Sequence, residues 1–185
     1  MEGAAPRSQP GASMQALLKV FWDIALWRRG PRDLPHSRRL LAACAFLYLS
    51  TSVLEAELFD GSALAVARGI ADLVFTVAVF ALCLVLGRRS YRLPQTLTAV
   101  LGTGTLLAIP TIGVWLLAGA IGPEGPVASA VKLLLLPLVV WDLCVVAHIV
   151  RQALDAPLVV GVAVATTYFL LDVLLLERLV PATVS

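Results

Sequence analysis

Charged residues lie within or beside the long apolar runs of this 185-residue chain, where ordinary surface charges are not expected. An ionisable group near the middle of a membrane span costs about 2.5–3.5 kcal/mol on insertion scales. Such groups are therefore functional candidates by default. The intramembrane polar candidates in this chain are Arg68, Asp72, Lys132, Asp142, His148 and Asp172.

Most of these candidates are predicted to share the outer third of the membrane. Asp72 precedes the Arg-Arg pair that ends its apolar run by 16 residues, which is roughly 24 Å along a helix. Asp172 reaches a similar height, as do Arg68, Lys132 and Glu55. One interpretation is a polar cavity that opens to the far side and binds an ion or a polar headgroup. The other, which we favour, is a buried network in which Asp72 pairs with Arg68 and with Lys132 or Asp172, beside charges that extend to the interface.

Asp142 lies nearer the middle of its apolar run, nine residues before Arg151 and thus about 13 Å from that edge. It follows Pro137, and proline usually kinks a helix. Asp142 and His148 on one span suggest a proton relay, but a spacing of six turns them about 120° away from alignment. We favour hydrogen bonds from Asp142 to a neighbouring helix, in which the available hydroxyls are those of Thr103, Thr105 and Thr111.

Motifs for enzymatic chemistry are absent from the sequence. None of the dinucleotide-binding, phosphate-loop, zinc-protease or serine-hydrolase patterns occurs. The three cysteines stand far apart in apolar runs without metal-ligand spacing, and His36 and His148 are the only histidines. We therefore expect a protein that is not an enzyme and that has no catalytic residues, no metal and no cofactor.

The elements that carry these residues are predicted from composition. Hydrophobic residues make up 59% of the chain and charged residues 14%, whereas a soluble domain carries about 25% charged residues. A membrane-spanning helix needs about 20 apolar residues. The sequence thus predicts an all-α polytopic membrane bundle of five transmembrane helices, preceded by an amphipathic interfacial helix. The expected spans are residues 40–58, 65–87, 94–120, 127–150 and 157–178 within a domain of 39–180.

The ends of the chain are predicted to lie outside this domain. Residues 1–12 are expected to be disordered, 13–38 to form a cytoplasmic amphipathic helix and basic linker, and 181–185 to form a tail. The helix either lies in the bilayer interface or packs on the bundle, and we weigh the two equally. The arginines that follow it predict contact with anionic lipid headgroups; they are Arg28, Arg29, Arg32, Arg38 and Arg39.

The distribution of positive charge predicts the orientation. With a cytoplasmic N-terminus, 11 of the 14 lysines and arginines fall on the cytoplasmic side, as the positive-inside rule requires. We therefore expect a multi-pass protein of a bacterial inner membrane, with its C-terminus on the far side. The net charge of +2 is too small to indicate a nucleic-acid partner.

The organisation of the chain resembles the YIP (Ypt/Rab-interacting protein) family of small five-span membrane proteins. The likeness rests on a cytoplasmic N-terminal segment followed by five closely spaced spans, and on features between residues 92 and 163. Those features are Arg92, Gln95, Thr96, Leu97, Pro110, Trp141 and the short turn 150–157. The resemblance implies membrane organisation or trafficking through protein partners, without catalysis, and it assigns no functional residues.

Two functions follow as hypotheses. The first is a non-enzymatic scaffold or assembly partner, acting with a protein partner or as a homo-oligomer in the lipid bilayer. The alternative is a small transporter or channel subunit that uses Asp142, Asp72 and Asp172. A transporter requires these aspartates to face one water-accessible cavity, whereas a scaffold requires them to be paired or buried against neighbours.

Overall fold

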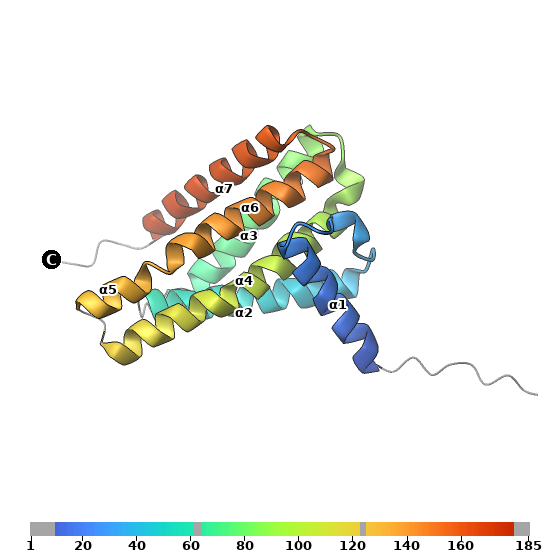
Figure 1. The fold of residues 1–185 in the computed structure, drawn as a ribbon. Coiled ribbons are helices and arrows are strands. Elements are labelled where there is room, and N and C mark those ends of the chain that lie inside the picture. Colours follow the sequence, from blue (N-terminus) through green and yellow to red (C-terminus); the bar gives the residue numbers. More distant parts are fainter. Residues whose placement is uncertain (1–9, 61–63, 123–124, 180–185) are drawn as a thin grey trace, which may run out of the picture.

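The computed structural model describes residues 10–60, 64–122 and 125–179, with side chains placed for 14–58, 64–122 and 125–175. Its elements follow the chain in the order of Figure 1. The helices are α1 (Pro10–Ala25), α2 (Arg38–Asp60), α3 (Ala65–Leu86), α4 (Leu93–Ile121), α5 (Pro126–Lys132), α6 (Leu135–Leu154) and α7 (Leu158–Leu179). Two 3₁₀ turns, η1 (Pro31–Asp33) and η2 (Ser90–Arg92), precede α2 and α4.

Five stretches are long and apolar enough to cross a membrane: α2, α3, α4, the α5–α6 pair and α7. Their large apolar side chains face outward in many places, as with Phe46 (70% exposed) and Val159 (77% exposed). So much exposed apolar surface is expected where lipid, not water, surrounds the helices. The prediction of an all-helical membrane bundle is confirmed, and the described helices cover nearly all of the residue ranges expected for the five spans.

Helix α4 lies at the centre of the bundle and packs on α1, α2, α3 and α6. Two glycines let neighbours approach it closely. A Cβ atom at Gly102 would overlap the ring of Phe21 from α1, and one at Gly104 would press on the ring of Tyr48 from α2. The buried hydroxyl of Thr103 donates to the Ala99 carbonyl oxygen of its own helix at 2.7 Å, so the central helix brings few unpaired polar groups into the core.

The predicted fourth span, residues 127–150, is broken into α5 and α6 just before Pro137, the proline from which the sequence predicts a kink. Proline has no N–H to donate to the carbonyl four residues earlier, and for Pro137 that residue is Leu133. The Leu133 carbonyl oxygen instead accepts from the Leu136 N–H, 3.1 Å away. The tightened turn ends α5 and starts α6 in a new direction, which Figure 1 shows as a bend.

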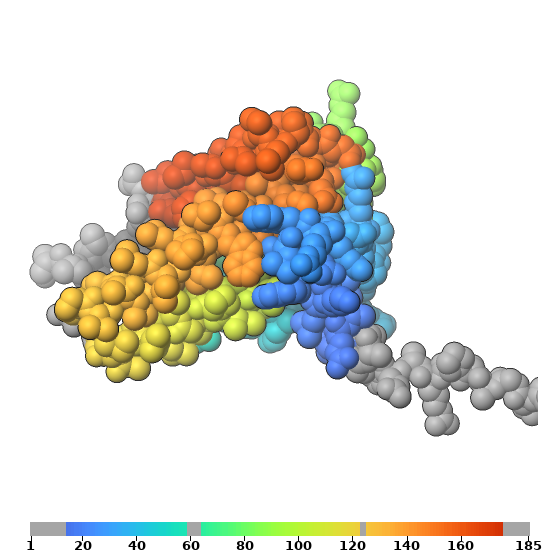
Figure 2. Space-filling model, in the orientation of Figure 1, coloured from blue at the N-terminus to red at the C-terminus, as the bar shows by residue number. Residues whose placement is uncertain are grey.

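Helix α1 packs against the bundle beside α4 and α6 (Figure 2). Phe21, Ile24 and Ala25 are buried there. The indole N–H of Trp141 donates to the Ala25 carbonyl oxygen at 2.9 Å, and its ring meets Trp22 edge-on at a centroid distance of 6.2 Å. The helix starts at Pro10, so residues 10–12, predicted as disordered, are helical. The predictions for 1–9 and 181–185 lie outside the described residues.

One end of the bundle, formed by η1 and the α3–α4 and α6–α7 connections, is held by arginines; we call it the arginine-rich end. Asp155 forms ion pairs there with Arg32, with Arg89 (Nη1–Oδ2 3.1 Å) and with Arg92 (Nη1–Oδ2 2.9 Å). The Arg92 guanidinium also donates to the Ala153 carbonyl oxygen at 3.0 Å. One carboxylate thus joins three segments that are distant in the sequence.

Candidate functional site

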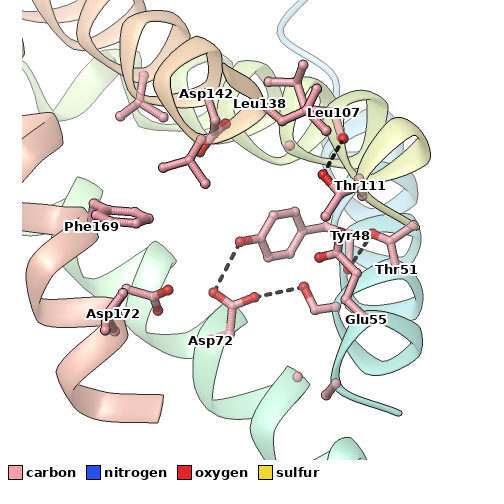
Figure 3. Close-up of a pocket in the computed structure, with 18 of the residues that line it drawn as sticks. Tyr48, Thr51, Glu55, Asp72, Leu107, Thr111, Leu138, Asp142, Phe169 and Asp172 are labelled. Carbon is pink, nitrogen blue, oxygen red and sulfur yellow. Dashed lines mark hydrogen bonds between the residues drawn. The ribbon is translucent and has the colours of Figure 1, made fainter. Parts of the chain in front are cut away.

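A cavity of about 480 Å³ lies among α2, α3, α4, α6 and α7 (Figure 3). It is towards the end of the bundle opposite the arginine-rich end, because Glu55 near the end of α2 and Arg68 near the start of α3 line it. Its volume falls in the range typical of small-molecule sites, about 300–1,000 Å³. The polar residues that line it are Tyr48, Thr51, Ser52, Glu55, Arg68, Asp72, Thr111, Asp142, Tyr168 and Asp172. The four acidic side chains come from four different helices, which Figure 3 shows around one space.

Apolar side chains form the rest of the cavity wall. Leu107, Leu138 and Phe169 border it at the level of the acids. Val100 and Val146 line it and are themselves buried. Between these two valines and the arginine-rich end, the core of the bundle is packed with buried residues such as Ile149. The cavity is therefore closed towards the arginine-rich end.

Three hydroxyl groups from two helices, α2 and α3, surround Asp72. Its carboxylate accepts hydrogen bonds from Ser52 Oγ at 2.7 Å, from Tyr48 at 3.1 Å and from Thr76 Oγ1 at 3.4 Å. Tyr48 and Ser52 are four residues apart and so share one face of α2. The Thr76 hydroxyl also lies 2.9 Å from that of Tyr168 on α7. This hydroxyl network links α2, α3 and α7 and holds Asp72 in one position.

Asp142, Asp172 and Glu55 differ from Asp72 because they accept no hydrogen bond and form no ion pair within the described part of the chain. The Oδ1 atom of Asp172 is buried and has no partner there. A buried polar atom without a partner costs free energy, about 1–3 kcal/mol or more for a charged group. These carboxyl groups are thus free acceptors at the surface of the cavity.

The residues predicted to neutralise Asp72 lie elsewhere or bind differently. Arg68 is buried and lines the same cavity. In the described part of the chain, the hydrogen bonds that Asp72 accepts come from hydroxyl groups and not from Arg68. The Lys132 ammonium lies 5.7 Å from the centre of the Trp115 ring, at the distance of a cation–π contact. Asp172 lines the cavity without pairing to Asp72.

The predicted hydrogen bond from Asp142 to a threonine of the neighbouring helix is wrong. The Thr103, Thr105 and Thr111 hydroxyls each donate to a backbone carbonyl of α4. In an apolar surrounding, a carbonyl oxygen one turn earlier is the nearest acceptor for a threonine. Asp142 is left facing the cavity.

His148 and the arginines near it belong to the arginine-rich end. His148 Nε2 lies 2.9 Å from the Arg29 carbonyl oxygen, which is not the geometry of a relay with Asp142. Arg29 pairs with Asp23 at 3.3 Å, and Arg32 pairs with Asp155. The remaining members of the predicted membrane-surface set are exposed; they are Arg28, Arg38 and Arg39.

Sequence reasoning missed the hydroxyl network around Asp72. Its members, Tyr48, Ser52, Thr76 and Tyr168, are uncharged and common in membrane helices, so nothing in their type distinguishes them. The available signals were two spacings of four residues, which put Tyr48 and Ser52 on one face of α2 and Thr76 one turn after Asp72 on α3.

Within the residues described, no three His, Cys, Asp or Glu side chains lie close enough together to hold a metal ion. The acids instead stand around the cavity as separate groups. In comparisons with known proteins, no family model, no curated protein and no solved structure matches this chain. The resemblance to the YIP family therefore stays a prediction, and function has to be argued from the cavity.

Proposed function

We propose that this multi-pass membrane protein is a small carrier, or the membrane subunit of one, which binds a solute in the cavity between α2, α3, α4, α6 and α7. The observation that carries this proposal is that Asp72, Asp142 and Asp172 line one cavity. A transporter needs its ionisable groups to face one space that a solute can enter. Ionisable groups in a membrane are stable only next to water, a partner or a ligand, and this cavity has room for water or a ligand beside the three aspartates.

The form of the cavity supports the same function. It is closed towards the arginine-rich end by packed core residues and by the Asp155 ion pairs. A carrier exposes its site to one side of the membrane at a time, and movement of one group of helices against another changes the side. With the orientation predicted from the arginines, the described arrangement is the state closed to the cytoplasm.

A scaffold is the second candidate, and one feature favours it. The outer face of α1 leaves Met14, Leu18 and Trp22 exposed beside the bundle. That apolar face would suit a protein partner as well as the bilayer interface. Replacing all three with serine should abolish a scaffold's partner binding but leave solute binding in the cavity unchanged.

Cysteine accessibility tests the carrier proposal with a matched pair on one helix. Thr111 lines the cavity, whereas Gly113 lies two residues further along α4, is exposed on the outside of the bundle and has open space around it. In a background in which Cys44, Cys83 and Cys144 are replaced by serine, a membrane-impermeant thiol reagent should label Thr111→Cys and leave Gly113→Cys unlabelled. Since the two positions have nearly the same depth, the difference reports water in the cavity. Equal lack of labelling in folded protein would refute a water-accessible site.

A further inference from the structure

We propose that the ligand of this cavity is an amphipathic organic cation, whose protonated amine, amidine or guanidine binds between Asp142 and Asp172 while its apolar part contacts Phe169 and the leucines opposite. This inference rests on the proposed function, because it names the substrate class of the same site. Three independent properties of the cavity lead to it: its charge, its unpaired acceptors and its apolar wall.

The charge of the cavity excludes anions. Four carboxyl groups line it, from Glu55, Asp72, Asp142 and Asp172, against one guanidinium among the described residues, that of Arg68. An anion would meet repulsion from carboxylates on four helices in a surrounding of low dielectric constant, where interactions between charges are strong. A cation is attracted by the same arrangement, so the charge selects the sign of the ligand.

The unpaired acceptors require a ligand that donates hydrogen bonds. Asp72 already accepts from Tyr48, Ser52 and Thr76. Asp142 and Asp172 have no donor within the described part of the chain, and one oxygen of Asp172 is buried without a partner. An ammonium group carries up to three N–H donors and a guanidinium five. A cationic group with several N–H donors therefore satisfies acceptors that the described part of the chain leaves empty.

The size and wall of the cavity favour an organic ligand over a bare divalent metal ion. A volume of about 480 Å³ is much larger than the share of one water molecule in the liquid, about 30 Å³. A divalent cation takes six or more oxygen ligands at 2.0–2.6 Å, roughly, and the described acids do not cluster in that way. Phe169 precedes Asp172 by three residues on α7, so an aromatic face lies beside the carboxylate, where it attracts a cation with an apolar body.

A pair of isosteric probes tests the ligand class. We expect the purified wild-type chain in detergent to bind the aromatic amidinium p-aminobenzamidine saturably, and to bind p-aminobenzamide, which has the same shape without the charge, at least about tenfold more weakly, since a charge-assisted hydrogen bond adds about 1.5–3 kcal/mol. Equal binding of the two probes, or no saturable binding of the amidinium by monodisperse protein, would overturn the proposal.

Matched variants locate the binding groups. Asp142→Asn and Asp172→Asn keep the side-chain shape and should each weaken amidinium binding about 10- to 100-fold. Glu57→Gln removes an exposed carboxylate from α2 that does not line the cavity, and it should leave the affinity unchanged. Wild-type affinity in both aspartate variants, with elution and melting temperature unaltered, would contradict the assignment of the site.

One readout separates the two proposals. In Thr111→Cys protein, p-aminobenzamidine should slow labelling by the thiol reagent, whereas p-aminobenzamide should not. If Thr111→Cys is labelled and neither probe protects it, the cavity is open to water but the ligand class is wrong. If Thr111→Cys is not labelled at all, the carrier proposal itself fails.

Discussion

Replacing Asp155 by asparagine tests how the arginine-rich end is held together. Asp155 begins the α6–α7 connection with a left-handed backbone, φ 54°. Asparagine tolerates that conformation better than most residues, so the substitution removes the charge and leaves the turn intact. The variant therefore isolates the ion pairs with Arg32, Arg89 and Arg92 from any effect on the backbone.

The expected loss of stability follows from the exposure of the three partners. The Arg32 and Arg89 side chains are 51% and 35% exposed, and pairs of that kind contribute about 0.2–1 kcal/mol each. The Arg92 side chain is 14% exposed, which places its pair between the surface and buried limits, at about 1–2 kcal/mol. Together they predict a loss of about 1.4–4 kcal/mol, or about 3–16 °C in Tm for a chain of this size.

Reactivity of the buried Cys44 thiol on heating provides the assay. Cys44 is 5% exposed, so a thiol-reactive dye reaches it only when the bundle opens, once Cys83 and Cys144 are replaced by serine. The difference between wild type and Asp155→Asn should shrink in high salt, which screens the exposed pairs. Asp155→Gly, which favours the left-handed backbone, should be no more stable than Asp155→Asn. The reasoning would be refuted if Asp155→Asn lowered the Tm by less than about 2 °C, or if Asp155→Gly had the Tm of the wild type.

Two further substitutions test the packing of α1. Gly102→Val places a side chain where the Phe21 ring lies, so we expect a loss of about 1–3 kcal/mol from overpacking and a lower Tm in the same dye assay. Gly113→Val, on the open side of the same helix, should not lower the Tm, and an equal loss at both glycines would show that the effect is general to α4. Trp141→Phe keeps an aromatic ring but removes the donor to the Ala25 carbonyl oxygen, a bond of about 0.5–1.5 kcal/mol. It should speed proteolysis at Lys19 on α1, and an unchanged cleavage rate would mean that packing alone holds the helix.

The number and placement of the spans could be predicted because each span satisfies its backbone hydrogen bonds internally, so that apolar length is a sufficient signal. The charged lining of the cavity was also predictable as a set of positions, since Asp72, Asp142 and Asp172 stand out in apolar runs. Hydropathy does not specify the rotation of each helix about its axis. For that reason the convergence of the aspartates and the hydroxyl network at Asp72 came only from the structure.

The position of α1 was undecided for a different physical reason. An amphipathic helix presents the same pattern whether its apolar face meets lipid or a neighbouring helix. What decides between them is a complementary surface elsewhere, here the space that Gly102 leaves for Phe21 and the indole N–H that Trp141 offers to the end of α1. Pro137 was recognised as a source of distortion, yet the full break at Leu133–Leu134 depends on which donor the freed carbonyl finds.

The arginine-rich end also has a consequence for how the chain is assembled during synthesis. The Arg32 side chain donates to the Gln152 carbonyl oxygen, 120 residues later in the chain, at 3.1 Å. The indole partner of Ala25 is likewise more than a hundred residues away, on α6. Helix α1 leaves the ribosome before α4 and α6 but cannot complete its contacts until α6 has been inserted. Until α4 has been inserted, the apolar face of α1 has only the bilayer surface to cover it, and the hydrogen bond from Trp141 forms later still, so α1 is among the last of the described helices to reach its final place.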